Sequence, residues 1–324
     1  MAGSILRVDL RQLKYFIAIA EQENFSRAAQ QLYVAQSALS RRMRDLEDEL
    51  GVRLFDRHLR GAALTPDGRD LLERARYLLR SFEQLRSDLA DDRAHPSGPV
   101  GVGMTPNFAA MVGPQFALAV RKRYPLAQLR IVEAYSPDLR NMVRSGGIDM
   151  AVLSGSAPVP LDDLAVEPLF EDRLCLVGLA GETVMQRAEL GINHLRGLSL
   201  ILTGTSSAGI RNEIEALASR KRVPLQVTVE VASIGVATQM IRLGMGYTVY
   251  VAAGVTQESD LGAVPIAGLW LQRSLAWPMK RPMSRLGGEV LALLRAHLLA
   301  LVEGGGWQGA RMLRRRRMPM TTTN

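Results

Sequence analysis

Apolar residues recur at helical spacing along the first fifty residues of the chain. The run LRQLKYFIAIAE predicts a helix over residues 10–21, because its apolar positions repeat every three or four residues. A second helix is predicted over residues 27–32 with Ser26 as its N-cap. A third is predicted over residues 35–50, where Gly51 supplies the left-handed cap that commonly ends a helix. These segments predict a compact helical unit at the start of the chain.

The third predicted helix has one apolar and one polar face. Its apolar stripe consists of Leu39, Met43, Leu46 and Leu50. Its opposite face carries Gln36, Ser37, Ser40, Arg41 and Arg44. Gln pairs with adenine edges, Arg with guanine or phosphate, and Ser with either, so near the start of a helix this face predicts major-groove contact with DNA. The alternative is a helical bundle whose Arg and Ser face is merely solvated.

Residues 52–65 predict two short strands around residues 58–61. We interpret this hairpin as a wing, with Arg57 and Arg60 placed to contact the DNA backbone. Ser26 and Arg27, where the second helix begins, complete the candidate DNA-binding residues.

One long run carries a family resemblance. FSRAAQQLYVAQSALSRRMRDLEDELGVRLFDR, followed by LTPDG at 64–68, resembles the DNA-binding domain of the LysR-type transcriptional regulators. The resemblance implies a winged helix-turn-helix over residues 8–65 that binds double-stranded operator DNA. Ala35 departs from the family pattern, because the family usually has Ser or Thr at this helix cap. We expect this Ala to cost about 1 kcal/mol of helix stability without abolishing DNA binding.

A further helix is predicted over residues 66–91, with Thr65 as its cap and Pro66 at its first position. Its apolar residues alternate at spacings of four and three, which is typical of a helix paired with another helix. This seam comprises Leu71, Ala75, Leu78, Phe82, Leu85 and Leu89. The alternative is that the stripe packs on its own domain. The family has a linker helix here, so the resemblance implies that residues 66–92 join a homodimer or homotetramer, and a two-fold dimer predicts a roughly palindromic operator.

After a hinge-like run at 91–99, the pattern changes from Val100 to alternating strands and helices, which predicts an α/β region. The resemblance implies a two-lobed effector-binding domain over residues 96–302 that is similar to periplasmic solute-binding proteins. Lobe I is expected over 96–168 and 270–302, lobe II over 169–269, and the chain is expected to cross between them near 168–172 and 265–270. Gly98–Leu153 and the RHLRG wing resemble the nitrogen-assimilation-control branch of the family.

Hydroxyl residues follow several predicted strands, where open α/β sheets bind ligands at helix N-termini. The candidate effector-binding residues are Thr105, Ser136, Thr203, Thr205, Ser206 and Tyr250. Their hydroxyls and nearby backbone N–H groups suit a small anion such as a carboxylate, and plain N-capping is the alternative. The run Val251-Ala252-Ala253 stands where many family members have Pro, so this wall of the pocket is expected to differ in shape.

Composition limits the remaining possibilities. The net charge is +8, but five positive charges come from Arg311 and residues 314–317, which leaves +3 for the rest. The segment 303–324 is therefore interpreted as a disordered basic tail. The chain has no run of about 18 apolar residues, no secretory signal pattern and one cysteine, so we expect a cytoplasmic protein without membrane contact. The four histidines are scattered, so neither a metal nor another cofactor is expected, and Cys175 is interpreted as an inert core residue.

Two other classes of function are alternatives to a transcriptional regulator. A solute-binding or transport-related protein would use only the two-lobed region, and the helix-turn-helix argues against it. An enzyme would need a base, a nucleophile or a metal site, and no such constellation stands out in the sequence. The expected partners are operator DNA, a small anionic effector, further copies of the chain and RNA polymerase.

Overall fold

The computed structural model describes residues 8–58, 61–90, 96–155, 163–204, 209–255 and 259–313. In the helix that ends at Ala90, it describes the side chains up to Leu79 except Glu73, and then those of Ser81, Phe82 and Leu85. The chain divides after Pro99 into two compact units, with the short turn Ser145–Gly147 grouped with the first. Among the helices so described, none is both long and apolar enough to span a membrane.

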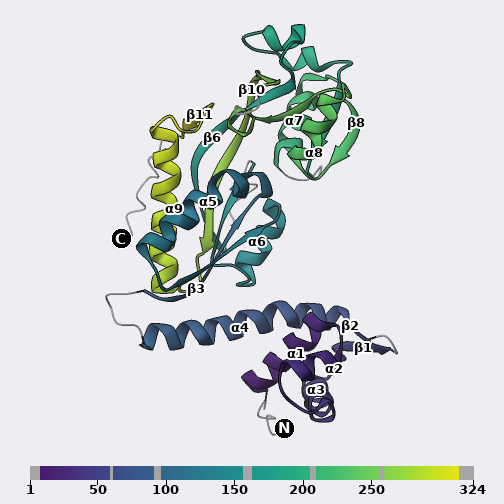
Figure 1. Cartoon of the computed structure of the whole chain (residues 1–324), viewed down its shortest axis with the longest axis vertical. Helices are drawn as coiled ribbons and strands as arrows, with labels where there is room; N and C mark the ends of the chain where they lie inside the picture. Colours follow the sequence, from purple (N-terminus) through teal and green to yellow (C-terminus); the bar gives the residue numbers. More distant parts are fainter. Residues whose placement is uncertain are drawn as a thin grey trace, which may run out of the picture. The chain divides into compact units, whose positions relative to one another are not determined.

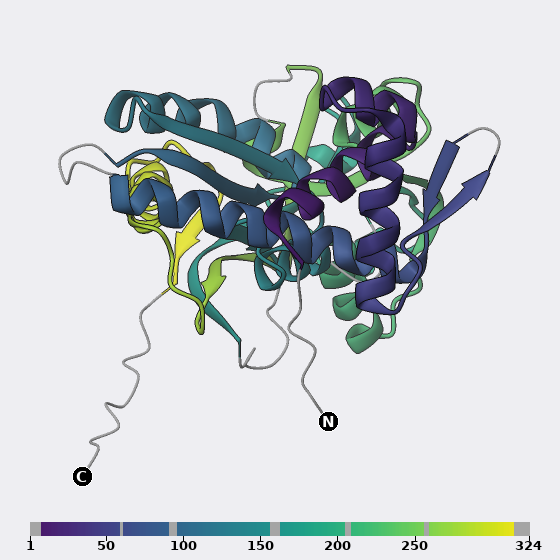
Figure 2. The ribbon, with the colours of Figure 1, turned by 90° about the horizontal axis from the view of Figure 1, so that it is seen from below.

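The first unit is a winged helix-turn-helix followed by a long helix (Figure 1). Its elements are α1 (Leu10–Gln22), α2 (Phe25–Gln31), α3 (Gln36–Leu50), β1 (Phe55–His58), β2 (Gly61–Leu64) and α4 (Pro66–Ala90). The two strands pair antiparallel from Phe55 opposite Leu64 to His58 opposite Gly61. Figure 2 shows this hairpin projecting from the helical part of the unit. The predicted wing is thus present.

Local side-chain chemistry sets the helix ends in this unit. The Asp9 carboxylate accepts a hydrogen bond from the Gln12 N–H, and the Gln12 side-chain oxygen accepts one from the Asp9 N–H, which is a capping box at the start of α1. Asn24, and not the predicted Ser26, caps α2, because its side-chain oxygen accepts hydrogen bonds from two N–H groups of the first turn. Ala35 begins α3 without any side-chain cap, and Gly51 ends it at φ 69°.

Aromatic and aliphatic side chains from every element of the first unit form one core. The ring of Phe55 on β1 packs against Phe16 of α1, with centroids 5.3 Å apart, and against Phe25 of α2, at 5.5 Å. Ala75 of α4 is fully buried in this core, and Leu71 packs against it. These two positions of the predicted seam therefore belong to the unit's own interior, as α4 lies against α1.

The second unit is an α/β structure of two lobes. Its strands are β3 (Gly98–Met104), β4 (Ala127–Glu133), β5 (Met150–Ser154), β6 (Leu164–Leu179), β7 (Ser199–Thr203), β8 (Gln226–Val231), β9 (Thr248–Val251), β10 (Leu261–Pro278) and β11 (Ala310–Met312). Its α-helices are α5 (Pro106–Arg123), α6 (Ser136–Arg144), α7 (Gly209–Lys221), α8 (Ile234–Arg242) and α9 (Arg285–Glu303). Three short 3-10 helices, η1 (Thr183–Gln186), η2 (Ile192–Leu195) and η3 (Ala252–Gly254), were not expected from the pattern.

Two long antiparallel strands, β6 and β10, run from one lobe into the other (Figure 1). They lie within a sheet of order β11-β6-β10-β5-β3-β4, in which β9 also pairs with β6. Strands β7 and β8 pair parallel in a separate sheet, to which Tyr247 adds a bridge at Leu200. The predicted strands over 264–266 and 271–277 are therefore parts of one strand.

The hydrophobic cores locate the crossing between the lobes. Phe170 on β6 and Leu275 on β10 belong to the core of lobe I. Leu174 and Leu271 belong to the core of lobe II. The chain therefore crosses near residue 172, as predicted, and near residue 273, beyond the predicted 265–270, because lobe II still buries Leu271.

The interpretation of 303–324 as a disordered tail is wrong for its first part. Residues 304–313 leave α9, bury Trp307 at 6% exposure and form β11 on the edge of β6. The glycine-rich composition of this segment suggests disorder. Burial of the large Trp307 ring nevertheless provides enough apolar contact to hold the segment in place. The Arg block at 314–317 lies outside the described residues.

Candidate DNA-binding face and effector pocket

The polar face of α3 is open to solvent. Gln36, Ser37, Arg41 and Arg44 are exposed and Ser40 is half-buried, whereas Leu39, Met43 and Leu46 opposite them have no exposed surface. Burial of the apolar stripe fixes the rotation of the helix, because each buried side chain contributes about 1.5–3 kcal/mol. The core thus holds the polar set outward as one surface.

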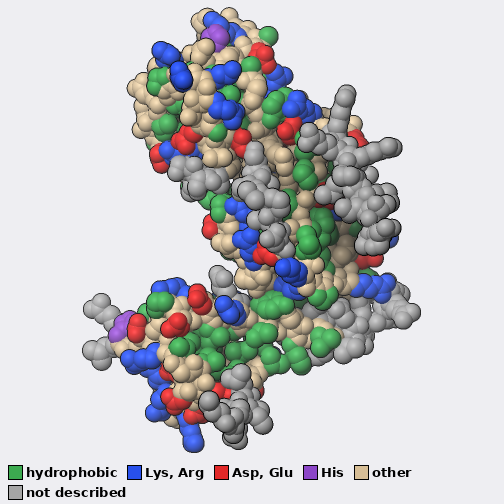
Figure 3. Space-filling view, turned by 180° about the vertical axis from the view of Figure 1, so that it is seen from behind, with side chains coloured by type: hydrophobic (Ala, Val, Ile, Leu, Met, Phe, Trp, Pro, Cys, Tyr) green, Lys and Arg blue, Asp and Glu red, His purple; other side chains and the backbone are tan. Residues whose placement is uncertain are grey.

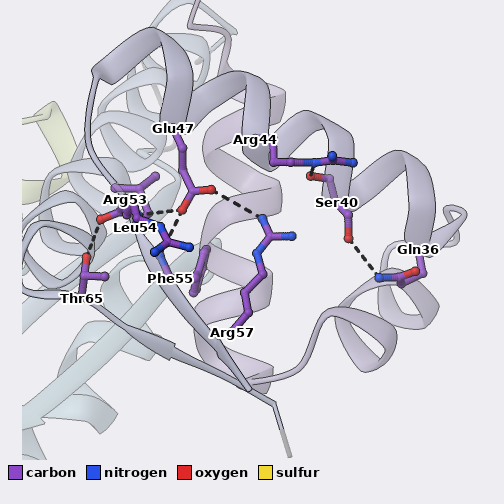
Figure 4. Close-up of polar contacts among 9 residues, drawn as sticks. All are labelled: Gln36, Ser40, Arg44, Glu47, Arg53, Leu54, Phe55, Arg57 and Thr65. Atoms are coloured by element: carbon purple, nitrogen blue, oxygen red, sulfur yellow. Dashed lines mark hydrogen bonds and ion pairs between the residues drawn. The ribbon is translucent and has the colours of Figure 1, made fainter. Parts of the chain in front are cut away.

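Contacts within α3 hold part of this face in order (Figure 4). The Gln36 side-chain amide donates a 2.9 Å hydrogen bond to the Ser40 hydroxyl, one turn along the helix. Arg44 Nε lies 3.5 Å from the Ser40 carbonyl oxygen. Arg41 has no ion-pair partner within the described chain, so its charge is available to an external anion.

A carboxylate ties the wing to α3. Glu47 accepts hydrogen bonds from the backbone N–H groups of Leu54 (2.8 Å) and Phe55 (3.2 Å) and pairs with Arg57 at 3.5 Å (Figure 4). The Arg57 guanidinium also lies 4.5 Å from the centroid of the Phe25 ring. Arg57 is thereby held at the base of the wing beside the exposed face of α3.

The remaining predicted DNA-binding residues divide into two groups. Ser26 and Arg27 are exposed in the first turn of α2, and Arg27 lines a surface groove together with His58 of the wing. Arg60, at the tip of the wing, lies outside the described residues.

The far part of α4 presents apolar side chains to solvent. Leu78, Phe82 and Leu85 are 48%, 49% and 55% exposed. Figure 3 shows hydrophobic side chains gathered along this part of the first unit. The Leu89 side chain lies outside the described residues. A solvated row of large apolar side chains marks a surface for association.

The second unit has a small pocket between its two lobes that is partly open to solvent. Lobe I contributes Thr105, Pro106, Asn107, Tyr135 and Ser154, lobe II contributes Thr203, Gly204, Gly209, Ile210, Ala232 and Tyr250, and β10 contributes Leu271 and Arg273. The Tyr135 hydroxyl reaches across to the Ala232 carbonyl oxygen at 3.3 Å. Thr105 is the N-cap of α5 but makes no side-chain capping bond, so the free N–H groups of the first turn, which begin at Asn107 after Pro106, have no acceptor from Thr105.

A buried cation stands in the pocket wall at the crossing between the lobes. Arg273 is 4% exposed, and its Nε donates a 2.6 Å hydrogen bond to Asp172, which is 1% exposed. A second nitrogen of Arg273 donates to the Ser154 hydroxyl, and its guanidinium lies 4.7 Å from the Phe108 ring centroid. The Trp307 indole N–H donates a 2.6 Å hydrogen bond to the other oxygen of Asp172. A buried ion pair whose two charges both have hydrogen-bond partners can keep its charge inside a protein.

Three of the six predicted effector residues line this pocket, namely Thr105, Thr203 and Tyr250. Ser136 does not line it, because its hydroxyl is buried and bonds both the N–H and the carbonyl oxygen of Ser154. Thr205 and Ser206 lie outside the described residues. Burial raises the pKa of the Tyr250 hydroxyl far above its usual range, so this group stays a neutral hydrogen-bonding phenol.

Arg273 is a candidate functional residue that is absent from the set predicted from the sequence. It is the single charge in the apolar run LQRSLAW, residues 271–277, and a charge in an apolar strand is a signal for a buried partner or site. Its partner Asp172 lies about a hundred residues earlier, on β6. Their pairing depends on the register of β6 and β10, which periodicity alone does not provide.

Cys175 is 1% exposed in β6. Burial raises the pKa of its thiol to about 11. The thiolate is the reactive form of cysteine, so this thiol is held in its unreactive state.

Comparison with known proteins places this architecture in a family. Residues 10–69 match the model of the bacterial regulatory helix-turn-helix protein, lysR family, and residues 93–299 match the LysR substrate binding domain. The transcriptional regulator BbuR of Bordetella bronchiseptica is 30% identical, over 93% of this chain and 94% of its own length. A hydrogen peroxide-inducible genes activator of Pectobacterium carotovorum is 28% identical, over 91% of this chain and 99% of its own length. A full-length OxyR variant from Pseudomonas aeruginosa superposes with a TM-score of 0.70 at 23% identity, over 96% of this chain and 99% of its own, and so shares the fold.

The chain belongs to the LysR family of transcriptional regulators, with an N-terminal DNA-binding helix-turn-helix and a C-terminal effector-binding domain of two α/β lobes. The predicted family, fold class and regulatory function are confirmed. The transport-related alternative has no support, because these relatives are named as regulators and activators of transcription. The nitrogen assimilation regulatory protein nac of Klebsiella aerogenes is also similar, at 31% identity over 75% of this chain and 78% of its own length. Because the other relatives carry different roles in their names, membership of that branch stays a prediction.

Proposed function

We propose that the chain binds operator DNA as a two-fold dimer and alters transcription when a small anion occupies the pocket between its lobes. The exposed face of α3 carries the DNA-binding part of the proposal. Gln36, Ser40 and Arg41 provide the donors and acceptors that distinguish bases in the major groove. Arg57, with Arg60, contacts the DNA backbone and fixes the register of the domain.

The exposed apolar row on α4 supports the dimeric part of the proposal. Leu78, Phe82 and Leu85 pack against the same row of a second copy, which removes them from water. Two DNA-binding domains related by a two-fold axis then contact two half-sites on one face of the DNA. The relatives' names support a role at promoters, where RNA polymerase is the further partner that we propose, in the cytoplasm.

Charge and helix geometry support an anionic effector. Arg273 offers a buried guanidinium, and the first turn of α5 offers backbone N–H groups at the positive end of its helix. Thr105, Thr203 and Tyr250 add hydroxyls around the same space. A carboxylate fits this set, because guanidinium and helix N-termini both hydrogen-bond its two oxygens. None of the groups is a nucleophile paired with a base, and we propose that the pocket binds without chemical turnover.

Genomic footprinting of the purified full chain tests the DNA-binding part. We expect the wild type to protect discrete sites near promoters. The Ser40→Ala/Arg41→Ala double variant should lose them with its fold intact by circular dichroism, because Arg41 is exposed and Ser40 lies outside the buried apolar stripe of α3. Arg121→Ala removes an exposed charge from α5 and is the matched control, expected to leave the footprints unchanged. Identical footprints from the wild type and the double variant would overturn the assignment of α3.

A further inference from the structure

The ten residues after α9 form a docked segment that we name the C-terminal arm, Gly304–Leu313. Its anchor is Trp307, which is 6% exposed. The indole ring packs against Phe108 of lobe I at 5.5 Å and against Phe170 of β6 at 6.0 Å between centroids. The arm thus inserts its one large aromatic side chain at the place where β6 crosses between the lobes.

Backbone pairing holds the rest of the arm on the same strand. Ala310 lies opposite Asp172 and Met312 opposite Phe170 in an antiparallel ladder, and the Arg173 N–H donates to the Gly309 carbonyl oxygen at 2.9 Å. The Arg311 guanidinium pairs with Glu171 at 2.7 Å and lies 3.7 Å from the centroid of the Trp270 ring. Arg311 is therefore engaged within its own chain.

The arm contacts lobe II as well. Gly309 has φ 78°, and a Cβ added there would lie 3.4 Å from Cβ of Ala252 in η3. The positive φ favours glycine at position 309, and Ala252 beside it is part of the Val251-Ala252-Ala253 run at which this chain departs from the family pattern. The arm therefore spans the crossing from the core of lobe I to the wall of lobe II that carries Tyr250.

Trp307 contacts two of the three groups that hold Arg273 in the pocket wall, Asp172 and Phe108. Its N–H bonds one oxygen of Asp172 while Arg273 Nε bonds the other, and its ring packs on Phe108, over which the Arg273 guanidinium lies. With one carboxylate oxygen taken by the indole, Asp172 binds Arg273 through a single nitrogen. The terminal nitrogens of the guanidinium are left to Ser154 and to the pocket that Arg273 lines.

We propose that the C-terminal arm controls effector affinity, with Trp307 as a positioning residue for Arg273. The inference rests on the proposed anion pocket. Without the indole N–H, Asp172 gains a free oxygen and takes Arg273 in a two-pronged pair, which is stronger and withdraws the guanidinium from the effector. By reciprocity, a bound anion strengthens docking of the arm by the same factor. The arm lies beyond residue 299, where the match to the substrate binding domain ends.

Trp307→Phe removes the N–H and keeps an aromatic ring against Phe108 and Phe170. We expect this variant to bind acetate and succinate about tenfold more weakly than the wild type, in ligand-observed NMR titrations of the full chain at constant ionic strength. Trp277→Phe is the matched control, because Trp277 lies on β10 beside Arg295 and does not line the pocket. A chain ending at Leu313 should bind as the wild type does, and one ending at Glu303 should bind as weakly as Trp307→Phe.

A second readout follows the arm itself. In wild-type protein labelled with 5-fluorotryptophan, acetate should shift the fluorine resonance that is lost in Trp307→Phe, and it should leave the Trp277 resonance in place. Equal anion affinity in Trp307→Phe and wild type, with weaker binding in Arg273→Lys, would overturn the control by the arm and leave the pocket standing. Equal affinity in all three proteins, or a wild type that binds neither acetate nor succinate, would overturn both.

Discussion

The α3 face and the interlobe pocket each present an arginine, but one arginine is exposed and the other is buried. Arg41 stands in solvent without an ion-pair partner among the described residues, whereas Arg273 is 4% exposed and bonded to Asp172 and Ser154. An exposed cation suits DNA, because DNA brings many phosphates and the contact forms with little desolvation. A buried cation suits a small anion, because its field is barely screened and its partners fix where the anion lies.

The two regions therefore differ in the substitutions they tolerate. The core behind α3 sets the rotation of the helix, so the side chains on its exposed face can be removed without disturbing the fold. The pocket cation is part of the core at the crossing of β6 and β10, so its removal leaves Asp172 buried and short of a partner. Substitutions at the two regions should therefore differ in their effects on stability and on DNA binding.

Replacing Arg273 by Met should give the largest loss of stability. Breaking a buried ion pair leaves an uncompensated charge, which costs about 3–5 kcal/mol of unfolding free energy. The matched control is Arg295→Met, because Arg295 pairs with Glu167 at a partly exposed site and such pairs contribute ~1 kcal/mol or less. Urea denaturation of both variants measures the difference. Equal losses in the two variants would show that burial of the pair has no energetic consequence.

Placing charges on the exposed row of α4 should separate the copies of the chain. Leu78→Asp/Phe82→Asp puts two carboxylates where we propose that two helices meet, and we expect self-association to weaken at least a hundredfold, ~3 kcal/mol. Sedimentation velocity reports the change. Val236→Asp is the control, because it places a charge at an exposed apolar residue on α8, away from the row on α4. A double variant that sediments as the wild type does would refute pairing through α4.

Giving α3 its missing cap should stabilise the first unit modestly. Ala35 makes no side-chain capping bond, so Ala35→Ser should add about 1 kcal/mol, seen as slower amide hydrogen exchange in α3. Asn24→Ala is the converse test, since Asn24 caps α2 through two N–H groups and its loss should cost a similar amount in α2. Unchanged hydrogen exchange in Ala35→Ser would mean that the N–H groups in the first turn of α3 gain nothing from a side-chain cap.

Cys175 should show the smallest effect. With its pKa near 11, only about a thousandth of the thiol is ionised at pH 8, so native protein should react slowly with a thiol reagent and quickly once unfolded. Peroxide treatment should leave DNA binding unchanged, although one relative is named as a hydrogen peroxide-inducible activator. A peroxide response that disappears in Cys175→Ala would contradict the assignment of this thiol to the inert core.

The sequence sufficed for the DNA-binding unit because its information is local. Helix spacing gave the buried stripe Leu39, Met43 and Leu46, and everything opposite that stripe had to face solvent. Thr65 and Gly51 were likewise identified as caps from neighbouring residues, and the structure confirms both. Only the cap of α2 was misassigned, because Asn24 and Ser26 are both good N-cap residues two positions apart.

The pocket could be predicted only in outline because its chemistry is nonlocal. Strand ends located Thr105, Thr203 and Tyr250, since a strand end can be recognised from one segment. The pairing of Arg273 with Asp172 requires the register of two strands, and the docking of Trp307 requires the surface of a lobe to be built first. The same reason explains Ala75, whose place in a heptad pattern gave no sign that α1 covers it.

Selection from a random pool of double-stranded DNA tests the central claim, that the exposed face of α3 provides the sequence specificity of a paired regulator. Wild-type protein should enrich one roughly palindromic motif, with half-sites spaced by whole turns of the double helix. Ser40→Ala/Arg41→Ala should enrich no motif while it still binds DNA without preference at low salt. Enrichment of the wild-type motif by the double variant, or of no motif by the wild type, would contradict the account.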